Sequence, residues 1–254
     1  MLWWQILLIV AGSFIVLMTF SIIFYKSFFK RFWDILLSFI AILVLSPVLL
    51  LLIIIGAIAM KGNPFFVQKR PGKKKKDKTE VVFKLIKFRT MSNKKDENGN
   101  LLPDDQRLSS YGKFLRSTSL DELPELFNIF IGNMSIIGPR PQLVKDMVFM
   151  TLEQRNRHNV RPGLSGLAQV NGRNNISWEQ KFEYDLKYVN HISFFSDIGI
   201  ILKTFVKVFK RSDIEREGTV SDIDYGDFLL NEGKIDQNEY EQKINEAKAI
   251  LEVN

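Results

Sequence analysis

The chain has 254 residues and a formal net charge of +7, and this length accommodates one catalytic domain together with membrane elements. It contains no Cys and only 2 His, which excludes disulfides, thiolate nucleophiles and metal sites built from Cys or several His side chains. Charge is uneven: residues 61–120 hold 16 Lys or Arg against 6 Asp or Glu, whereas residues 213–254 hold 4 basic and 12 acidic side chains. A basic segment beside apolar runs favours anionic lipid over nucleic acid as its partner.

Residues 2–25 form an apolar run without a formal charge. As a helix the run would measure about 36 Å, which exceeds the hydrocarbon core of about 30 Å. Trp3 and Trp4 suit a membrane interface, and neither a basic start nor a small-residue cleavage site marks a secretory signal. We therefore expect an uncleaved transmembrane anchor over residues 1–25, with its C-terminal end in the cytoplasm because basic side chains follow it directly.

Residues 35–60 form a second uncharged run that is also long enough to cross a bilayer. Basic residues flank both of its ends, so both ends resemble cytoplasmic segments. Near the middle, Pro47 removes a backbone donor, and the hydroxyl of Ser46 can satisfy the freed carbonyl. The sequence predicts a re-entrant helix over residues 26–61, broken at Ser46-Pro47; the alternative is a kinked helix that spans the membrane.

Residues 62–220 are predicted to form a cytoplasmic catalytic domain of α/β class. Two strands, 65–68 and 81–88, would pair as a hairpin with a turn at Pro71-Gly72. Helical periodicity covers 141–160, 178–189 and 194–209. The last of these has an apolar stripe and a basic end, which fits either an amphipathic helix at the membrane interface or an ordinary packed helix.

Residues 221–254 form an acidic segment without evident chemistry. We expect a loosely attached C-terminal appendage, with a break at Gly233 and a helix over 238–252.

Adjacent carboxylates, Asp121 and Glu122, follow the basic segment. One interpretation is a capping box, because Glu122 lies three residues after Ser119. However, Pro124 is tolerated only in a first helical turn, so the helix more naturally begins near Leu120 or Asp121. There the helix dipole would keep Asp121 ionised as a nucleophile, and Glu122 could bind a divalent cation. A metal ion or cationic side chains must screen this pair when it faces a phosphate, and the candidate cations are Lys87, Arg89 and Arg116.

Three stiff or Gly-rich segments downstream hold further cationic or amide side chains: Arg140 between two prolines, Arg161 before Pro162-Gly163, and Asn171 with Arg173 around Gly172. Each is compatible with a structural turn whose Arg is solvated. Together they predict one pocket for a phosphate or nucleotide, although none matches a P-loop or Rossmann pattern.

These segments, in this order, resemble the bacterial sugar transferase family, the small monotopic phosphoglycosyl transferases. The resemblance runs from about residue 30 to about residue 219 and rests on residues 31–34 (RFWD), 46–47 (SP), 68–72 (QKRPG), 87–91 (KFRTM), 120–126 (LDELPEL), 134–141 (MSIIGPRP), 161–166 (RPGLSG) and 169–174 (QVNGRN). The N-terminal run, the acidic appendage and the lysine block at 73–76 depart from the shared pattern.

The resemblance implies transfer of a sugar 1-phosphate from a UDP-sugar to polyprenyl phosphate at the cytoplasmic face of the bacterial inner membrane, as the priming step of capsule, exopolysaccharide or glycoprotein-glycan assembly. It implies that Asp121 attacks the sugar-bearing phosphate, that Glu122 helps hold Mg²⁺, and that Arg116 and Arg140 steady phosphate or nucleotide. The expected partners are the UDP-sugar, polyprenyl phosphate, the phospholipid membrane and, as an option, a second copy of the chain, with no nucleic acid.

Two rival hypotheses remain at this stage. One is a noncatalytic membrane-anchored protein that binds lipid or nucleic acid and uses the Asp-Glu pair only as a helix cap. The other is direct attack by a metal-activated lipid phosphate, without a covalent intermediate on Asp121.

Overall fold

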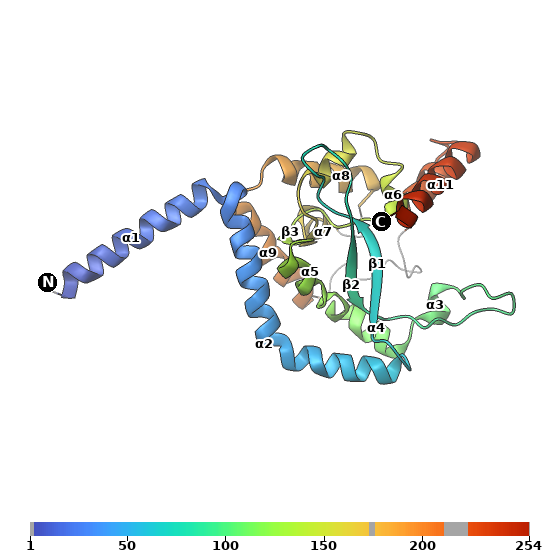
Figure 1. Ribbon diagram of the computed structural model, residues 1–254, viewed down its shortest axis with the longest axis horizontal. Helices are drawn as coiled ribbons and strands as arrows, with labels where there is room; N and C mark the ends of the chain where they lie inside the picture. Colours follow the sequence, from blue (N-terminus) through green and yellow to red (C-terminus); the bar gives the residue numbers. More distant parts are fainter. Residues whose placement is uncertain (1–2, 173–175, 211–222, 254) are drawn as a thin grey trace.

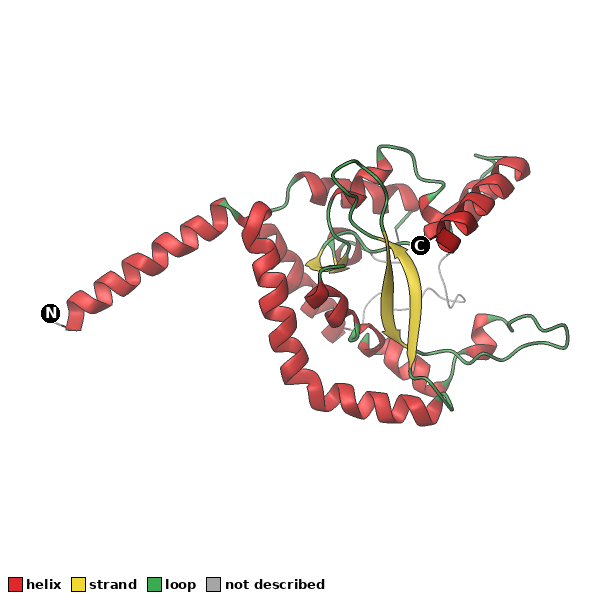
Figure 2. Cartoon of the chain, viewed as in Figure 1, coloured by secondary structure: helices red, strands yellow, loops and turns green. Residues whose placement is uncertain are grey.

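A computed structural model describes residues 3–172, 176–210 and 223–253. The chain is a helix-rich α/β protein with two small sheets (Figures 1 and 2). Its helices and strands are α1 (Trp3–Ile23), a π-helical turn (Tyr25–Phe29), α2 (Lys30–Ala59), β1 (Phe65–Pro71), β2 (Val82–Phe88), α3 (Asp104–Arg107), α4 (Ser110–Ser117), a 3₁₀ turn (Leu120–Glu122), α5 (Glu125–Ile131), β3 (Ser135–Ile137), α6 (Val144–Met147), a 3₁₀ segment (Gln154–Asn159), β4 (Gly163–Ser165), α7 (Leu167–Val170), α8 (Trp178–Asn190), α9 (Phe194–Lys210), α10 (Tyr225–Asn231) and α11 (Gln237–Val253).

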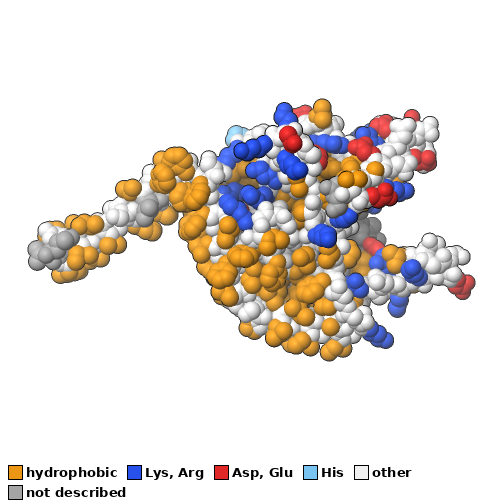
Figure 3. All heavy atoms as spheres, in the orientation of Figure 1, with side chains coloured by type: hydrophobic (Ala, Val, Ile, Leu, Met, Phe, Trp, Pro, Cys, Tyr) orange, Lys and Arg blue, Asp and Glu red, His pale blue; other side chains and the backbone are white. Residues whose placement is uncertain are grey.

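Two N-terminal helices have the length and composition needed to cross a membrane. Only 6% of the most apolar stretch of α1 is buried in the protein. For the segment Tyr25–Ala59 the buried share of the most apolar stretch is 17%. Hydrophobic side chains cover both helices on the face shown in Figure 3, and basic side chains gather on the domain beside them. Because a core helix of a soluble protein would be mostly buried, these two helices are suited to contact with lipid.

Helix α2 changes direction part-way along its length (Figure 1) and contains Pro47. Pro47 cannot donate to the carbonyl of Leu43, four residues earlier, and the Ser46 hydroxyl donates to that same oxygen at 2.7 Å. The prediction that Ser46 satisfies the freed carbonyl is confirmed.

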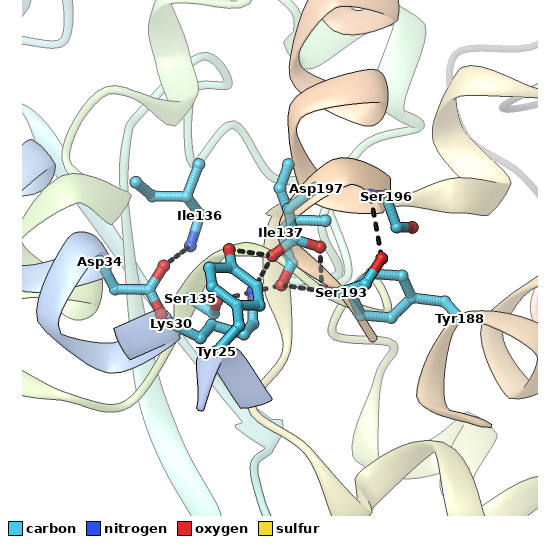
Figure 4. A network of polar contacts seen from close by, with 10 residues as sticks. All are labelled: Tyr25, Lys30, Asp34, Ser135, Ile136, Ile137, Tyr188, Ser193, Ser196 and Asp197. Carbon is cyan, nitrogen blue, oxygen red and sulfur yellow. Dashed lines mark hydrogen bonds and ion pairs between the residues drawn. The ribbon is translucent and has the colours of Figure 1, made fainter. Parts of the chain in front are cut away.

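The N-terminal end of α2 is anchored to the folded domain by a buried polar network (Figure 4). Asp197 of α9 accepts hydrogen bonds from Lys30 at 2.6 Å, from Tyr25 at 2.8 Å and from Tyr188 of α8 at 2.8 Å. Asp34 accepts from the backbone N–H of Ile136 in β3 at 2.9 Å. Buried charges are stable only when paired and hydrogen-bonded, so this network fixes where α2 enters the domain.

The C-terminal half of α2 contacts the same domain. The Tyr111 hydroxyl in α4 donates to the carbonyl of Leu52 at 3.1 Å. Leu49 and Leu52 are buried in one hydrophobic cluster with Phe88 and Leu115. Both halves of the helix are therefore attached to one folded domain.

Strands β1 and β2 form the predicted antiparallel hairpin, with Phe65 opposite Phe88 and Pro71 opposite Val82. The prediction of a turn at Pro71-Gly72 is wrong, because β1 runs through Pro71 and the Gly72 N–H still bonds to the Val81 carbonyl at 2.7 Å. The chain reverses later, where Lys78 adopts a left-handed conformation (φ 66°). The lysine block therefore extends the hairpin into a loop.

Helix α5 packs on the hairpin and on α2. The Asn128 side chain is fully buried; it accepts from Ile86 N–H at 3.0 Å and donates to the Lys84 carbonyl at 2.8 Å. Gly132 ends the helix with φ 103°, a conformation that favours glycine. A Cβ at this position would also lie 3.1 Å from the Arg31 guanidinium.

Strands β3 and β4 form a parallel pair that the sequence did not predict. A Cβ on Gly163 would lie 2.0 Å from the Gly138 backbone nitrogen, so only glycine permits this approach. Tyr188 joins α8 to this pair, because its hydroxyl oxygen, which donates to Asp197, also lies 3.1 Å from the Ile137 carbonyl oxygen.

The helices predicted at 178–189 and 194–209 are confirmed as α8 and α9. The continuous helix predicted over 141–160 is wrong: the segment contains only α6 and a 3₁₀ segment. Its apolar side chains serve two different clusters, Val144 and Met147 with α11, and Met150 with α8 and α10. Helix α6 ends at Met147, between the residues of the two clusters, and reciprocal hydrogen bonds between Thr151 and Gln154 turn the chain after Met150.

The C-terminal segment is packed onto the domain, so the prediction of loose attachment is wrong. Tyr225 and Leu229 of α10 are buried with Trp178, and Ala247 of α11 is buried against Met147. The predicted break at Gly233 (φ 65°) and the following helix are confirmed.

Candidate active site

Glu122 is the centre of a cluster of charged side chains. Its Oε1 atom accepts from Lys87 Nζ at 2.8 Å and from Arg140 Nη2 at 2.8 Å. Burial alone would raise the pKa of Glu122, but the charges of Arg140 and Lys87 outweigh it and hold that pKa well below its usual range. Glu122 is therefore ionised at neutral pH.

Glu125, the first residue of α5, belongs to the same cluster. Its Oε1 lies 3.0 Å from Lys87 Nζ, and its side chain is only 3% exposed. Burial raises the pKa of Glu125 to about 7, since Lys87 is shared with Glu122 and offsets the loss of hydration only in part. No role for Glu125 was predicted from the sequence. The pattern that could have indicated one is a third carboxylate three residues after Glu122.

Asp121 lies beside this cluster, half-buried, and no hydrogen bond to its carboxylate is found within the described ranges of the chain. Burial and the neighbouring Glu122 raise the pKa of Asp121, while the charges of Lys87, Arg116 and Arg140 act in the opposite direction. The carboxylate is thus under the electrostatic influence of three cations, and within the described residues its oxygens remain available for another partner.

The backbone around the pair differs from the prediction. Asp121 and Glu122 occupy a single 3₁₀ turn, and α5 begins only at Glu125. The capping-box interpretation is wrong, because Ser119 is left-handed (φ 56°) and its side chain caps no backbone N–H. Leu120 and Leu123 on either side pack into the core, which leaves the two carboxylates on the opposite side of the turn.

Arg140 is held by contacts to its own backbone and to that of its neighbour. Arg157 is buried, donates to the Arg140 carbonyl at 2.6 Å and forms an ion pair with Asp185 at 2.6 Å. Arg70 of β1 donates to the Pro141 carbonyl at 3.0 Å. Neither Arg157 nor Arg70 was among the predicted site residues; both supply positive charge next to the turn.

The structure therefore brings together Lys87, Asp121, Glu122 and Arg140, with Arg116 close enough to act on Asp121 electrostatically. Arg116 also donates to the Thr90 hydroxyl at 3.2 Å. Arg161 instead donates to the Gly132 carbonyl at 2.8 Å, and Asn171 to the Leu167 carbonyl at 2.7 Å.

The last two predicted residues are Arg89 and Arg173. Arg89 follows β2 directly, and no hydrogen bond or ion pair of its guanidinium is found in the described part of the chain. Arg173 lies outside the described residues.

The carboxylates can be tested as metal ligands by their chemistry. Across residues 3–172, 176–210 and 223–253 there is no group of three or more His, Cys, Asp or Glu arranged to hold a metal ion. Mg²⁺, however, is commonly bound by one or two carboxylates together with substrate phosphates and water. Asp121 and the Oε2 atom of Glu122 are hard oxygen donors of this kind, so the residues present fit a magnesium ion shared with a phosphorylated substrate.

The comparison with known sequences decides the family. The model of the family described as bacterial sugar transferase matches residues 25–211. The chain belongs to the bacterial sugar transferase family. It is therefore a transferase enzyme, and the rival hypothesis of a noncatalytic binding protein is wrong.

Relatives in this family include proteins of different length. The chain is 41% identical to "Uncharacterized sugar transferase EpsL" of Bacillus subtilis (strain 168), an alignment that covers 76% of this chain and 93% of the relative. It is 34% identical to "Exopolysaccharide production protein ExoY" of Rhizobium meliloti (strain 1021), covering 70% and 84%. It is 38% identical to "UDP-glucose:undecaprenyl-phosphate glucose-1-phosphate transferase" of Klebsiella pneumoniae, covering 71% of this chain but only 40% of that protein.

Proposed function

We propose that this sugar transferase moves a sugar 1-phosphate from a UDP-sugar to undecaprenyl phosphate at the cytoplasmic face of the bacterial inner membrane, the priming step of surface glycan assembly. The relative from Klebsiella pneumoniae carries this type of reaction in its name. The observation that carries the proposal is the half-buried carboxylate of Asp121, without a hydrogen-bond partner in the described chain, beside Lys87, Arg116 and Arg140.

Asp121 is the proposed nucleophile. One of its carboxylate oxygens forms a bond to the sugar-bearing phosphorus, and the bond from that phosphorus to the bridging oxygen of UMP breaks, with the electron pair leaving on UMP. An oxygen of undecaprenyl phosphate then attacks the same phosphorus, which releases the Asp121 carboxylate and yields the diphosphate-linked sugar. Two steps allow a soluble donor and a lipid acceptor to use one site in turn.

The other residues of the cluster position charge. Arg140 is proposed to contact phosphate or nucleotide while its Nη2 atom holds Glu122. Lys87 neutralises Glu122 and Glu125, which lowers the repulsion that an incoming phosphate would meet. Glu122 and Asp121 would hold Mg²⁺, which when bound supplies positive charge against the phosphate oxygens.

The helix α2 is proposed to be re-entrant rather than spanning. Straight, its 30 residues would extend about 45 Å. Three observations support a re-entrant α2: its change of direction (Figure 1), the proline inside it and the attachment of both its halves to one domain. α1 would be the transmembrane anchor over residues 1–25, and the exposed apolar side chains of α9, such as Phe195 and Leu202, would rest on the membrane surface.

Turnover tests the reaction. Purified protein with a UDP-sugar, Mg²⁺ and undecaprenyl phosphate is expected to release UMP, and Asp121→Asn is expected to abolish that release without unfolding the protein. Asp105→Asn provides a matched control, because Asp105 is an exposed carboxylate of α3 outside the charged cluster. A panel of UDP-sugars in the same assay identifies the donor. Undiminished release by Asp121→Asn contradicts the assignment of the nucleophile.

Topology is tested by labelling single cysteines, for which the natural chain provides a background without Cys. Ser27→Cys and Lys61→Cys place one thiol at each end of α2, on exposed residues. A re-entrant helix predicts that both thiols react from the same side of the membrane. Reaction from opposite sides would show a spanning helix.

A further inference from the structure

A cavity lined partly by lysines lies away from the Glu122 cluster. It encloses about 220 Å³ between the hairpin loop and the C-terminal end of α5. Its lining residues are Gly72, Lys73, Lys74, Lys75, Val81, Phe83, Gly132, Asn133 and Arg161. The proposed reaction uses no side chain of this cavity.

The helix α5 separates the two sites. Glu125 at its first position belongs to the Glu122 cluster, and Gly132, which ends the helix, lines the cavity. Seven residues of helix correspond to about 10 Å along the axis. A phosphate bound in the cavity therefore could not at the same time contact Asp121.

The cavity gathers positive charge without matching negative charge. Lys73, Lys75 and Arg161 form no ion pair in the part of the chain that the structure describes. Burial and the charge of Arg161 lower the pKa of Lys73. The carboxylate of Glu80 is occupied by Lys74 at 3.2 Å and His158 at 3.0 Å. Like charges held together in this way are stabilised by an anion placed between them.

The wall of the cavity at Gly132 lies next to the N-terminal end of α2. Arg31, the second residue of α2, donates to the carbonyls of Ile129 and Phe130, three and two residues before Gly132, at 2.7 and 2.9 Å. Phe130 stacks on Phe39 of α2, and Ile131 is 64% exposed. A ligand in the cavity would thus have its charge among lysines and its apolar part beside the lipid-facing side of α2.

We propose that this cavity binds the phosphate group of an anionic phospholipid headgroup and so fixes the hairpin loop to the membrane surface. The cavity volume admits a phosphate group with its ester oxygens, and the flanking apolar residues favour a lipid over free phosphate. Such binding is separate from turnover and is measured without the donor sugar.

Binding of a short-chain lipid to the full chain in neutral detergent tests the proposal by native mass spectrometry. The probes are dihexanoyl phosphatidylglycerol, dihexanoyl phosphatidylcholine and inorganic phosphate. Lys73→Gln removes one unpaired charge of the cavity; Lys76→Gln, an exposed lysine of the same run that does not line the cavity, is the matched control. We expect Lys73→Gln to weaken phosphatidylglycerol binding about fivefold, the effect of one cation near an anionic headgroup, and Lys76→Gln to change it less than about twofold.

The possible results distinguish a specific lipid site from unspecific attraction and from a site for a free anion. Saturable binding of phosphatidylglycerol that depends on Lys73 but not on Lys76 supports the site. Equal weakening by both variants indicates unspecific attraction and overturns it, as does equal binding of phosphatidylcholine. Inorganic phosphate that binds as tightly as the lipid, and is lost in Lys73→Gln, assigns the cavity to a free anion and overturns the lipid. Because no arm requires catalysis, failure here leaves the proposed reaction untouched.

Discussion

Arg140 and Glu122 lie on different elements, the turn after β3 and the 3₁₀ turn before α5, and are joined by a contact of 2.8 Å between Nη2 and Oε1. The contact fixes a guanidinium and a carboxylate next to Asp121. Arg140 is thereby oriented toward the site although its side chain is 36% exposed.

Replacing Arg140 by Lys tests this orientation. Lysine keeps the charge but loses the planar fork that can hold Glu122 and a phosphate together. We expect kcat/KM for UMP release to fall about 10²-fold, the effect of removing one preorganised donor. Arg155→Lys is the control, since within the described residues the Arg155 side chain donates only to the carbonyls of Met150 and Val148. Full activity of Arg140→Lys would show that only charge matters.

Glu125 predicts a pH dependence of stability. Its pKa of about 7 in the folded protein exceeds the ordinary value of 4.5, so the folded state binds the proton more tightly than the unfolded chain. The stability that this tighter proton binding contributes is fully present below the ordinary pKa of 4.5 and is lost as the pH rises through about 7. The thermal midpoint in detergent is expected to fall over this range.

Glu125→Gln imitates the protonated side chain and should make the midpoint less dependent on pH between about 5 and about 8. The quantity to compare between the wild type and the variant is the difference between the thermal midpoint at about pH 5 and the thermal midpoint at about pH 8. An unchanged difference would exclude Glu125 as the titrating group.

Asp197 anchors the start of α2. Asp197→Ala leaves Lys30, whose side chain is 14% exposed, without its partner, and we expect a loss of about 3–5 kcal/mol in unfolding free energy. Tyr25→Phe removes one neutral donor to the same carboxylate and should cost only about 1 kcal/mol. Denaturant unfolding in a neutral detergent measures both. Equal effects of the two variants would contradict the ion-pair account.

The C-terminal appendage is coupled to the turn of Arg140 through Asp146. One oxygen of Asp146 accepts from Leu143 N–H at 3.0 Å and the other from Tyr225 N–H at 2.9 Å. Asp146→Asn replaces one accepting oxygen by an NH₂ group that would face a backbone N–H donor. This change should lower the free energy of unfolding by about 1–3 kcal/mol and raise the KM for the nucleotide sugar.

The matched control for Asp146 is Asp227→Asn, the same change within the appendage at a side chain that, among the described residues, accepts only from the Tyr240 hydroxyl. A KM that rises equally in both variants would show that general loosening of the appendage, rather than the Leu143 contact, is responsible.

Local patterns predicted those parts of the fold that depend on neighbours in sequence. The long apolar runs, the hairpin and the helices α8 and α9 follow from periodicity, and the Ser46 contact follows from the chemistry of Pro47. The Asp-Glu pair and Arg140 were recognisable from motif and charge.

Other features depend on contacts between distant residues, which periodicity does not report. The parallel pair β3–β4 requires Gly163 to meet Gly138, and the segment 141–160 divides because its apolar residues serve two clusters. Glu125 was missed because its role depends on Lys87, 38 positions earlier along the chain. Arg161 was expected in the active-site pocket because it lies near Arg140 in sequence. The fold instead places it at the other end of α5, where it donates to the Gly132 carbonyl.

The central claim, that Asp121 carries the phosphosugar, is tested most directly by intact-protein and peptide mass spectrometry after incubation with the UDP-sugar and Mg²⁺ in the absence of lipid acceptor. We predict a mass increase of one sugar phosphate on the peptide that contains Asp121, discharged when undecaprenyl phosphate is added and missing from Asp121→Asn. An active preparation that never carries this adduct, and releases UMP only when the lipid is present, would contradict the covalent step and favour direct attack by the lipid phosphate.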